Sequence, residues 1–260
     1  MKKKRTTKAY SSASGLEKIN RIELRNLSEK FQKNIDTTNW NLNNSALFTN
    51  RQSLSRILFF NEIYKLIIGK PGSIIEFGVQ FGSTLSLLSK LRGIYEPYNY
   101  SRKIFGFDTF QGFPKKFNKS EKKIGWKKGD YTTGIVNYEK FLEKVLLNEE
   151  KNAPLSHIKK FELIKGDVTK TFPKFLKKNP QLIPALVIFD MDLYYPTKNI
   201  LKKILPRLFK GSVIVFDEIN CDYCPGETQA ILETLKLKEY KLRSFHGQTF
   251  SSYVVIDKKR

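Results

Sequence analysis

The sequence predicts an α/β fold whose sheet is mostly parallel and carries helices on both faces. Short apolar segments typical of buried strands alternate with segments that have apolar residues at helical spacing. Near the end of the chain, residues 241–245 and 252–257 read as two strands joined by a short link, which requires an antiparallel pair. We therefore expect a seven-stranded sheet with a final antiparallel strand.

The stretch SIIEFGVQFGSTLSLLSKL, residues 73–91, forms the first unit of this sheet. Its strand and its helix are joined by a turn that contains Gly78 and Gly82, as in a Rossmann-like fold. The turn lacks the G-x-G-x-x-G pattern that approaches a pyrophosphate. An acid at the strand end, Glu76, could receive the ammonium group of S-adenosylmethionine. The alternative is a plain turn that needs glycine for a positive φ angle.

Four further strands are predicted, at residues 103–108, 161–167, 185–190 and 212–217, and each ends in an acid. At the end of the second strand, Asp108 occupies the position that binds ribose hydroxyls in Rossmann folds. Its alternative role is to cap a loop. At the end of the third strand, Asp167 could meet an adenine amino group or cap the following turn.

The fourth and fifth strands end in the acidic segments DMD, residues 190–192, and DE, residues 217–218. Carboxylates that converge in one crevice repel each other unless a proton or a cation lies among them. Oxygen ligands suit Mg²⁺, so Asp190, Asp217 and Glu218 are candidate metal ligands. The alternative is that acids such as Asp192 cap the helices that follow, where negative charge is favourable.

Three other residues have chemistry worth weighing. His246 precedes the final strand and is a candidate general base, although a single histidine is more often structural. Cys221 and Cys224 are the only cysteines. A single C-x-x-C pair supplies too few ligands for zinc and excludes a disulfide framework.

Composition restricts the class of protein. The 260 residues carry a net charge of +22 that is mostly lysine, which we interpret as a solvated surface. An anionic substrate, a membrane surface or a nucleic acid are the alternatives. We find no apolar run that could span a bilayer and no apolar segment behind the basic N-terminus, so we expect no secretory signal and a cytoplasmic protein.

The expected organisation has three parts: a disordered basic tail at residues 1–15, a helical arm at 16–70 and the sheet-containing domain at 71–260. A long basic loop at residues 112–134 leaves the ligand end of the sheet. Long loops in compact domains are usually functional or disordered. We interpret this loop as a lid on the substrate side, with a disordered insertion as the alternative.

Five segments in this order, IIEFGVQFGST, IFGFDTFQGFP, DMDLYYPT, GSVIVFDEI and CDYCPGETQAI, resemble the macrocin O-methyltransferase family. The resemblance implies the class I methyltransferase fold, S-adenosylmethionine and Mg²⁺. The resemblance implies cofactor contacts at Glu76, Gly78, Gly82 and Asp108, and we expect Ser83 and Asp167 to contribute as well. The family commonly has two aspartates where this chain has Asp217 and Glu218. The glutamate carboxylate stands one methylene further from the backbone, which changes the geometry of the expected metal site.

The resemblance also implies roles for the acids: Asp190, Asp217 and Glu218 match the metal positions, and Asp190 or Asp192 could help to deprotonate the acceptor. We expect an O-methyltransferase for a sugar hydroxyl, on a nucleotide-linked deoxysugar, a surface-glycan precursor or a glycosylated metabolite. The alternatives are an RNA methyltransferase and a non-catalytic S-adenosylmethionine-binding module. We expect no nucleic-acid partner, and a homo-oligomer is compatible with the sequence.

Overall fold

The computed structural model describes residues 15–34, 45–248 and 250–257. The chain divides into two compact units, one formed by residues 9–58 and one that contains residues 59–260. The predicted basic tail lies outside the described residues except for Gly15. The predicted boundary between arm and domain, near residue 70, stays a prediction, and we describe each compact unit by itself.

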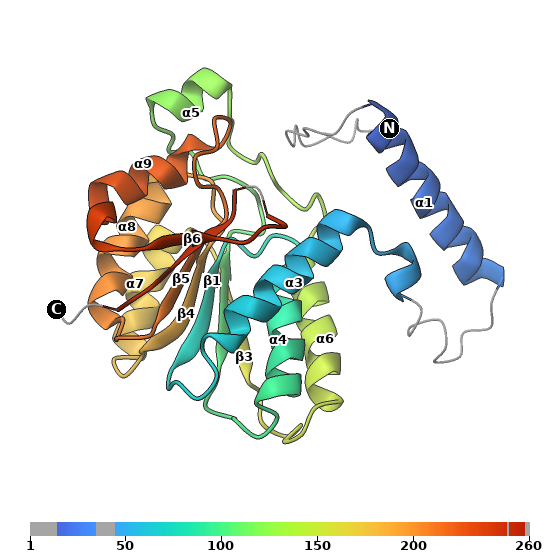
Figure 1. The fold of residues 1–260 in the computed structure, drawn as a ribbon, viewed down its shortest axis with the longest axis horizontal. Helices are drawn as coiled ribbons and strands as arrows, with labels where there is room; N and C mark the ends of the chain where they lie inside the picture. Colours follow the sequence, from blue (N-terminus) through green and yellow to red (C-terminus); the bar gives the residue numbers. More distant parts are fainter. Residues whose placement is uncertain (1–14, 35–44, 249, 258–260) are drawn as a thin grey trace. The chain divides into compact units, whose positions relative to one another are not determined.

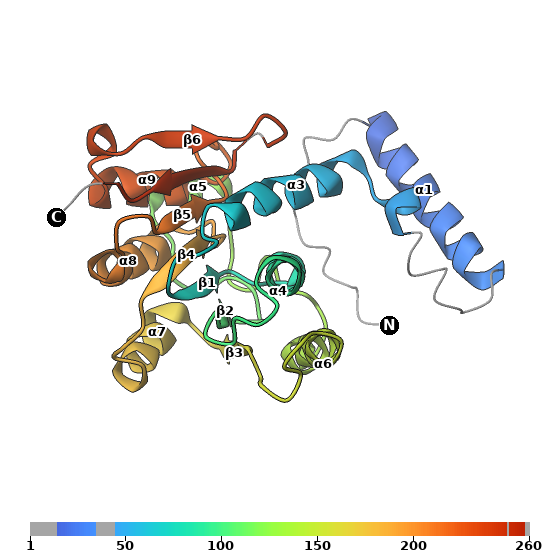
Figure 2. The same cartoon turned by 60° about the horizontal axis from the view of Figure 1, so that its bottom comes forward.

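The larger unit is built on a seven-stranded sheet with the order β3-β2-β1-β4-β5-β7-β6 (Figures 1 and 2). Five strands are parallel: β1 (Ser73–Phe77), β2 (Ile104–Asp108), β3 (Phe161–Lys165), β4 (Pro184–Phe189) and β5 (Val213–Phe216). The last two, β6 (Leu242–Ser244) and β7 (Ser252–Val255), pair antiparallel with each other, and β7 also pairs antiparallel with β5. The predicted fold class is confirmed.

Helices cover both faces of the sheet because successive strand residues point to opposite sides. On one face lie α3 (Arg51–Lys65, from Phe59 onward), α4 (Ser83–Tyr95) and α6 (Tyr138–Lys151). On the other lie α7 (Val168–Lys178), α8 (Tyr194–Ile204) and α9 (Pro225–Thr234). Shorter elements are α5 (Lys119–Ile124), η2 (Leu205–Arg207) and η3 (Leu237–Glu239).

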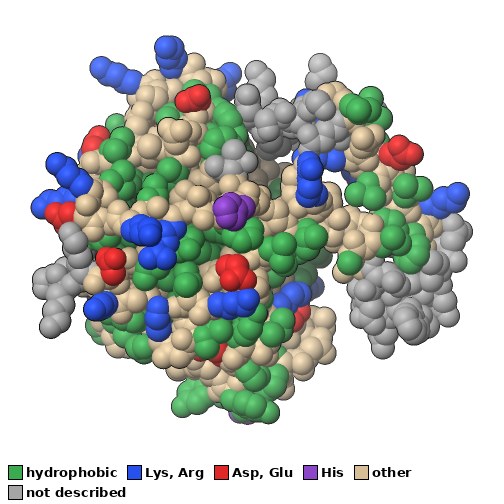
Figure 3. Space-filling view, in the orientation of Figure 1, with side chains coloured by type: hydrophobic (Ala, Val, Ile, Leu, Met, Phe, Trp, Pro, Cys, Tyr) green, Lys and Arg blue, Asp and Glu red, His purple; other side chains and the backbone are tan. Residues whose placement is uncertain are grey.

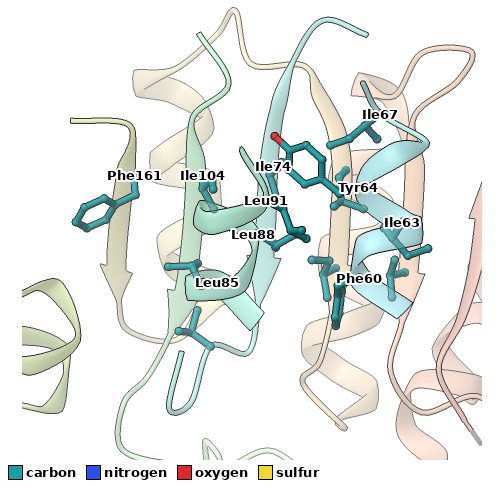
Figure 4. Packing of buried hydrophobic residues seen from close by; sticks show 14 of the residues in the cluster. Phe60, Ile63, Tyr64, Ile67, Ile74, Leu85, Leu88, Leu91, Ile104 and Phe161 are labelled. Atoms are coloured by element: carbon teal, nitrogen blue, oxygen red, sulfur yellow. The ribbon is translucent and has the colours of Figure 1, made fainter. Parts of the chain in front are cut away.

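The first helical layer packs on β1 and β2 through aliphatic and aromatic side chains (Figure 4). Ile74 of β1 and Ile104 of β2 are fully buried beneath Leu85 and Leu88 of α4. The residues that alternate with these in β1, Ile75 and Phe77, belong to the opposite core. Burial of such side chains stabilises the fold by roughly 1.5–3 kcal/mol each. The two cores fix the sheet on which the acid-bearing loops stand.

The smaller unit contains α1 (Gly15–Asn34), η1 (Ser45–Phe48) and the first turns of α3. Phe31 and Phe48 meet edge to face with their ring centroids 5.1 Å apart. No side chain that the structure describes between residues 15 and 58 is buried. Among all described residues, no helix combines the length and the apolar character that crossing a membrane requires.

The basic side chains are spread over the visible surface rather than gathered in one patch (Figure 3). Lysines and arginines alternate there with exposed hydrophobic side chains and with acids. This distribution agrees with our interpretation of the positive charge as a solvated surface.

Candidate active site

The acids at the ends of β4 and β5 meet at one edge of the sheet, the edge where the five parallel strands end. The Asp190 N–H donates to the carbonyl of Phe77 at 2.8 Å, and the Asp217 N–H donates to the carbonyl of Phe189 at 3.0 Å. These bonds extend the ladder beyond the strands. As a result, one carboxylate oxygen from each of Asp190, Asp217 and Glu218 lies within 4.8 Å of the other two. The structure therefore brings together the three predicted metal ligands.

Gly78 joins this group to the end of β1. Its φ angle is 95°, and a Cβ atom there would lie 1.7 Å from the carbonyl oxygen of Asp190. Only glycine permits both the backbone conformation and the close approach. The turn that the sequence assigns to the cofactor is thus in contact with the turn that carries the acids.

Asp108, at the end of β2, binds the turn between β1 and α4 that contains Gly78. Its carboxylate accepts the N–H of Gln80 at 2.8 Å and the N–H of Phe110 at 2.5 Å. Burial raises the pKa of Asp108, while the backbone donors act in the opposite direction. The loop-capping role is therefore present, and contact with a ribose stays a prediction.

The other predicted cofactor residues occupy distinct places. Asp167 is the N-cap of α7 and accepts hydrogen bonds from the Thr169 N–H at 2.9 Å and hydroxyl at 2.7 Å, as the capping alternative requires. Gly82 precedes α4 with a φ angle of 77°, and Ser83 is the exposed first residue of that helix. Glu76 is buried within β1. Their contacts with a cofactor stay predictions.

Asp192 is buried beside the three candidate ligands, with a φ angle of 60°. Burial raises its pKa to about 6, although hydrogen bonds with Glu218 and with the Cys224 thiol oppose the rise. It does not cap α8, whose N-cap is Leu193 without a side-chain bond. Burial, and then the charges of Asp192 and Asp217, raise the pKa of Glu218 well above its ordinary value.

Glu227 is a buried acid that the sequence analysis did not identify. Its carboxylate accepts the N–H of Met191 at 3.1 Å and the N–H of Glu218 at 3.2 Å, so it braces both acid-bearing loops. Burial, followed by the charge of Asp192, raises the pKa of Glu227 well above its ordinary value. The available signal was an acid directly after Pro225 and Gly226, in the first turn of α9.

The basic segment at residues 112–134, which we call the lid, is ordered and contains α5. Asn118 and Glu121 form a capping box around the start of α5. The side chain of Asn118 donates to Gln229 of α9 at 2.7 Å. The fully buried Glu121 also accepts the N–H of Tyr194, the first residue of α8, at 2.6 Å. The N-x-x-E spacing was the sequence signal for this capping box.

Tyr131 brings the lid to the acids. Its ring centroid lies 4.9 Å from that of Phe113, and its carbonyl accepts a hydrogen bond from the Gln80 side chain at 3.3 Å. Burial raises the pKa of the Tyr131 hydroxyl, and the neighbouring charges of Asp192 and Glu218 raise it further. Neither Gln80 nor Tyr131 was predicted as a site residue.

The remaining candidates lie at the margin of this group or beyond it. His246 is exposed in the turn between β6 and β7 and does not belong to the group of three acids. Its role as a base stays a prediction. Cys221 and Cys224 are buried free thiols, and burial raises the pKa of Cys224. Ser251, next to β7, donates to Asp217 at 2.9 Å.

A family model described as macrocin-O-methyltransferase matches residues 55–239. The chain belongs to the macrocin O-methyltransferase family. The enzyme class expected from the sequence, an O-methyltransferase, is the one that this description names, and a methyltransferase family implies S-adenosylmethionine as the methyl donor. The match covers most of the larger unit, including β1, the lid and the acidic segments.

Solved structures of similar proteins agree with this assignment. A crystal structure of CalS11, calicheamicin methyltransferase, is 36% identical over 96% of each chain, with a TM-score of 0.88. An apo structure of CalS11, described as a TDP-rhamnose 3'-O-methyltransferase, is 34% identical over 95% of this chain and 97% of that one, with a TM-score of 0.81. The O-methyltransferase NovP shares the fold at 19% identity, with a TM-score of 0.62 over 78% of this chain and 80% of that one.

A curated relative from Streptomyces olivaceus is 27% identical over 161 residues, which are 60% of this chain. It is the 8-demethyl-8-(2,3-dimethoxy-alpha-L-rhamnosyl)-tetracenomycin-C 4'-O-methyltransferase. The match spans 56% of that relative, a little over half of its length.

Proposed function

We propose that the protein transfers the methyl group of S-adenosylmethionine to a hydroxyl of a deoxysugar, with Mg²⁺ bound at the carboxyl edge of the sheet. The observation that carries this proposal is the group formed by Asp190, Asp217 and Glu218, whose oxygens lie within 4.8 Å of one another. The group adjoins the turn at Gly78, so donor and acceptor would meet at one place.

The cofactor half of the site is proposed to lie over the β1–α4 turn. Gly78 gives this turn its positive φ angle of 95°, and Asp108 stands at the strand end that binds ribose in Rossmann folds. Glu76, Gly82, Ser83 and Asp167 complete the proposed contacts.

The acids fit a magnesium ion. All three donors are carboxylates, and the Oε2 atom of Glu218 is buried without a hydrogen-bond partner among the described residues. Although Glu218 stands where the family commonly has aspartate, its carboxylate reaches the same group. Mg²⁺ held by Asp190, Asp217 and Glu218 would supply positive charge that favours loss of the acceptor's hydroxyl proton.

Asp192 is the proposed proton acceptor. With its pKa raised to about 6, it is largely ionised at neutral pH and still basic enough to take a proton. Asp190 and the exposed His246 are the other candidates. The deprotonated oxygen attacks the sulfonium methyl in line, the new C–O bond forms as the C–S bond breaks, and neutral S-adenosylhomocysteine leaves. Orientation of the two reactants supplies much of the rate enhancement.

A nucleotide-linked deoxysugar is the proposed acceptor. The names of CalS11 and of the tetracenomycin relative both specify rhamnose groups. The lid adds support because its seven lysines are all exposed, and such a basic surface favours a diphosphate. The lid's lysines are Lys115, Lys116, Lys119, Lys122, Lys123, Lys127 and Lys128.

The first test is calorimetric titration of S-adenosylhomocysteine into the protein with Mg²⁺ and then with EDTA. We expect binding in both conditions and methylation of TDP-rhamnose only with Mg²⁺. Asp217→Ala should lose turnover while it retains cofactor binding. Asp222→Ala, at a nearby exposed acid, is the matched control and should behave as the parent. Absence of S-adenosylhomocysteine binding, or equal loss of binding and turnover in Asp217→Ala, would contradict the proposal.

A further inference from the structure

We propose that Gln80 is a positioning residue that couples the cofactor turn to the lid and thereby places Tyr131 against the acceptor. This inference rests on the proposed function. It assigns a role to a residue outside the acids and glycines that define the site. It also explains how the cofactor turn and the lid on the acceptor side could be brought into place together.

Gln80 makes one hydrogen bond to each half. Its backbone N–H donates to Asp108 at 2.8 Å, and its side-chain amide donates to the carbonyl of Tyr131 at 3.3 Å. The φ angle of Gln80 is 47°, a left-handed conformation that strains a non-glycine residue. Such a conformation persists where the surroundings hold it, and these two bonds do so.

Hydrogen bonds and ring contacts inside the lid connect its other residues to the carbonyl that Gln80 holds. The Phe113 N–H donates to the carbonyl of Asp130 at 2.8 Å, and the Gly129 N–H donates to the carbonyl of Phe113 at 3.0 Å. The ring of Phe113 lies between its neighbours, with centroids 5.0 Å from Trp126 and 4.9 Å from Tyr131. A contact at Tyr131 therefore also fixes Trp126.

Tyr131 faces the chemistry from the lid side. Asp192 and Glu218 lie just beyond the ends of β4 and β5, and the lid is tied to the first of these loops because its Glu121 accepts the N–H of Tyr194 at 2.6 Å. An acceptor hydroxyl placed among these groups would have the tyrosine on one side and the carboxylates on the other. A bound cofactor that orders the turn at Gln80 would hold the lid in this position.

Coupling of this kind is reciprocal. If the cofactor favours the docked lid, then loss of the lid contact weakens cofactor binding by the same free energy. Because the contact is a single hydrogen bond, we expect that weakening to be about two- to ten-fold. Gln80 is thus expected to change the docking of the lid and the affinity for the cofactor by a factor of this size.

Trp126 provides the measurement. The chain has only one other tryptophan, Trp40, so a Trp40→Phe background isolates fluorescence from the lid. We expect saturating S-adenosylhomocysteine to lower the acrylamide quenching constant of Trp126 by about two-fold or more. Calorimetry on the same samples gives the affinity independently of the lid.

Two substitutions of Gln80 remove the link in different ways. Gln80→Asn shortens the side chain by one methylene, retains the backbone N–H, and places at this position a residue that tolerates a positive φ angle. Gln80→Glu keeps the length but, when ionised, has no N–H to donate. Both variants should lose most of the protection of Trp126 from acrylamide that S-adenosylhomocysteine gives in the parent. If one variant does not fold, the other still tests the link, because the two substitutions change the side chain in different ways. Gln111→Asn, at an exposed glutamine, is the control and should retain full protection.

The outcomes separate this inference from the proposed function. If S-adenosylhomocysteine does not bind the parent protein, the proposed function fails. If it binds but Trp126 stays equally accessible, or if both Gln80 variants keep full protection, only the coupling is overturned. Loss of affinity far beyond ten-fold in the variants would also overturn it, because Gln80 would then support the cofactor turn itself.

Discussion

The carboxylate of Glu121 in the lid accepts the backbone N–H of Tyr194, so α5 caps the first turn of α8. The segment that immediately precedes this turn carries Asp190 and Asp192. The second oxygen of Glu121 accepts the N–H of Asn118, which closes the capping box of α5 itself. One buried side chain therefore connects the lid to the loop that bears the proposed base.

Glu121→Ala should release the lid from α8. The change leaves two partly buried N–H groups without their acceptor, and each such loss costs up to about 1–3 kcal/mol of stability. We expect lower stability in urea denaturation and reduced turnover, with S-adenosylhomocysteine binding retained. Glu143→Ala, which removes an exposed ion pair with Lys159, is the control and should change stability by at most about 1 kcal/mol. Equal effects of the two substitutions would show that Glu121 does not anchor the lid.

Gly78→Ala should be strongly destabilising. A Cβ atom would meet the Asp190 carbonyl at 1.7 Å and would also strain a backbone with a φ angle of 95°. We expect a loss of at least about 3 kcal/mol, measured by thermal or urea unfolding. Gly93→Ala is the matched control, because Gly93 lies within α4 with no neighbouring atom within 4 Å of a new Cβ. That variant should gain about 0.5–1 kcal/mol.

Asp108→Asn tests the cofactor turn. The amide keeps one acceptor oxygen but presents its NH₂ group to one of the two N–H donors from Gln80 and Phe110. We expect S-adenosylhomocysteine affinity to fall by about ten- to a hundred-fold, or 1.4–2.7 kcal/mol. Asp257→Asn, at an exposed aspartate, should leave the calorimetric titration unchanged. An unchanged affinity for Asp108→Asn would remove this residue from the proposed cofactor site.

The buried acids predict how stability depends on pH in EDTA. The pKa of Asp192 is raised to about 6, and the pKa values of Glu218 and Glu227 are raised well above their ordinary values, in each case first by burial. The folded state then binds more protons than the unfolded state, so stability from these groups falls as pH rises from about 4 through 6 and above. We expect a lower melting temperature at pH 8 than at pH 6 in EDTA.

Two measurements separate this effect from other titrations. Asp192→Asn should show a smaller decrease between pH 6 and pH 8, because one of the coupled acids is gone. Added Mg²⁺ should raise the melting temperature more at pH 8, where its ligands are ionised. A melting temperature that increased with pH in EDTA would contradict the assignment of these groups as buried acids with raised pKa values.

Much of the sheet and the acid group could be predicted because strand ends are local in the sequence. The predicted strand at residues 185–190 was observed as Pro184–Phe189, and the strand at 212–217 as Val213–Phe216. Since parallel strands end at one edge, Asp190 and Asp217 were expected to be neighbours, and they are. The place of β7 between β5 and β6 was not predicted, because sequence order does not determine spatial order in the sheet.

The residues that were missed act through contacts between distant segments. Glu121 and Tyr194 are far apart in sequence, as are Glu227 and Met191, so no spacing pattern joins them. Helix α7 was read only as a turn, since it contains Pro173 and many lysines that obscure its apolar side. The link from Gln80 to Tyr131 depends on how the lid packs, which only the structure shows.

The direction of β7 has a practical consequence. Val255 pairs with Val213 at the start of β5, whereas Ser252 pairs with Phe216, next to Asp217. The chain therefore leaves β7 at the border of the sheet opposite the carboxylates. A biotin acceptor tag fused after this strand would anchor the enzyme to a sensor chip with its catalytic side facing the flow, so that collections of sugar nucleotides could be screened on captured protein.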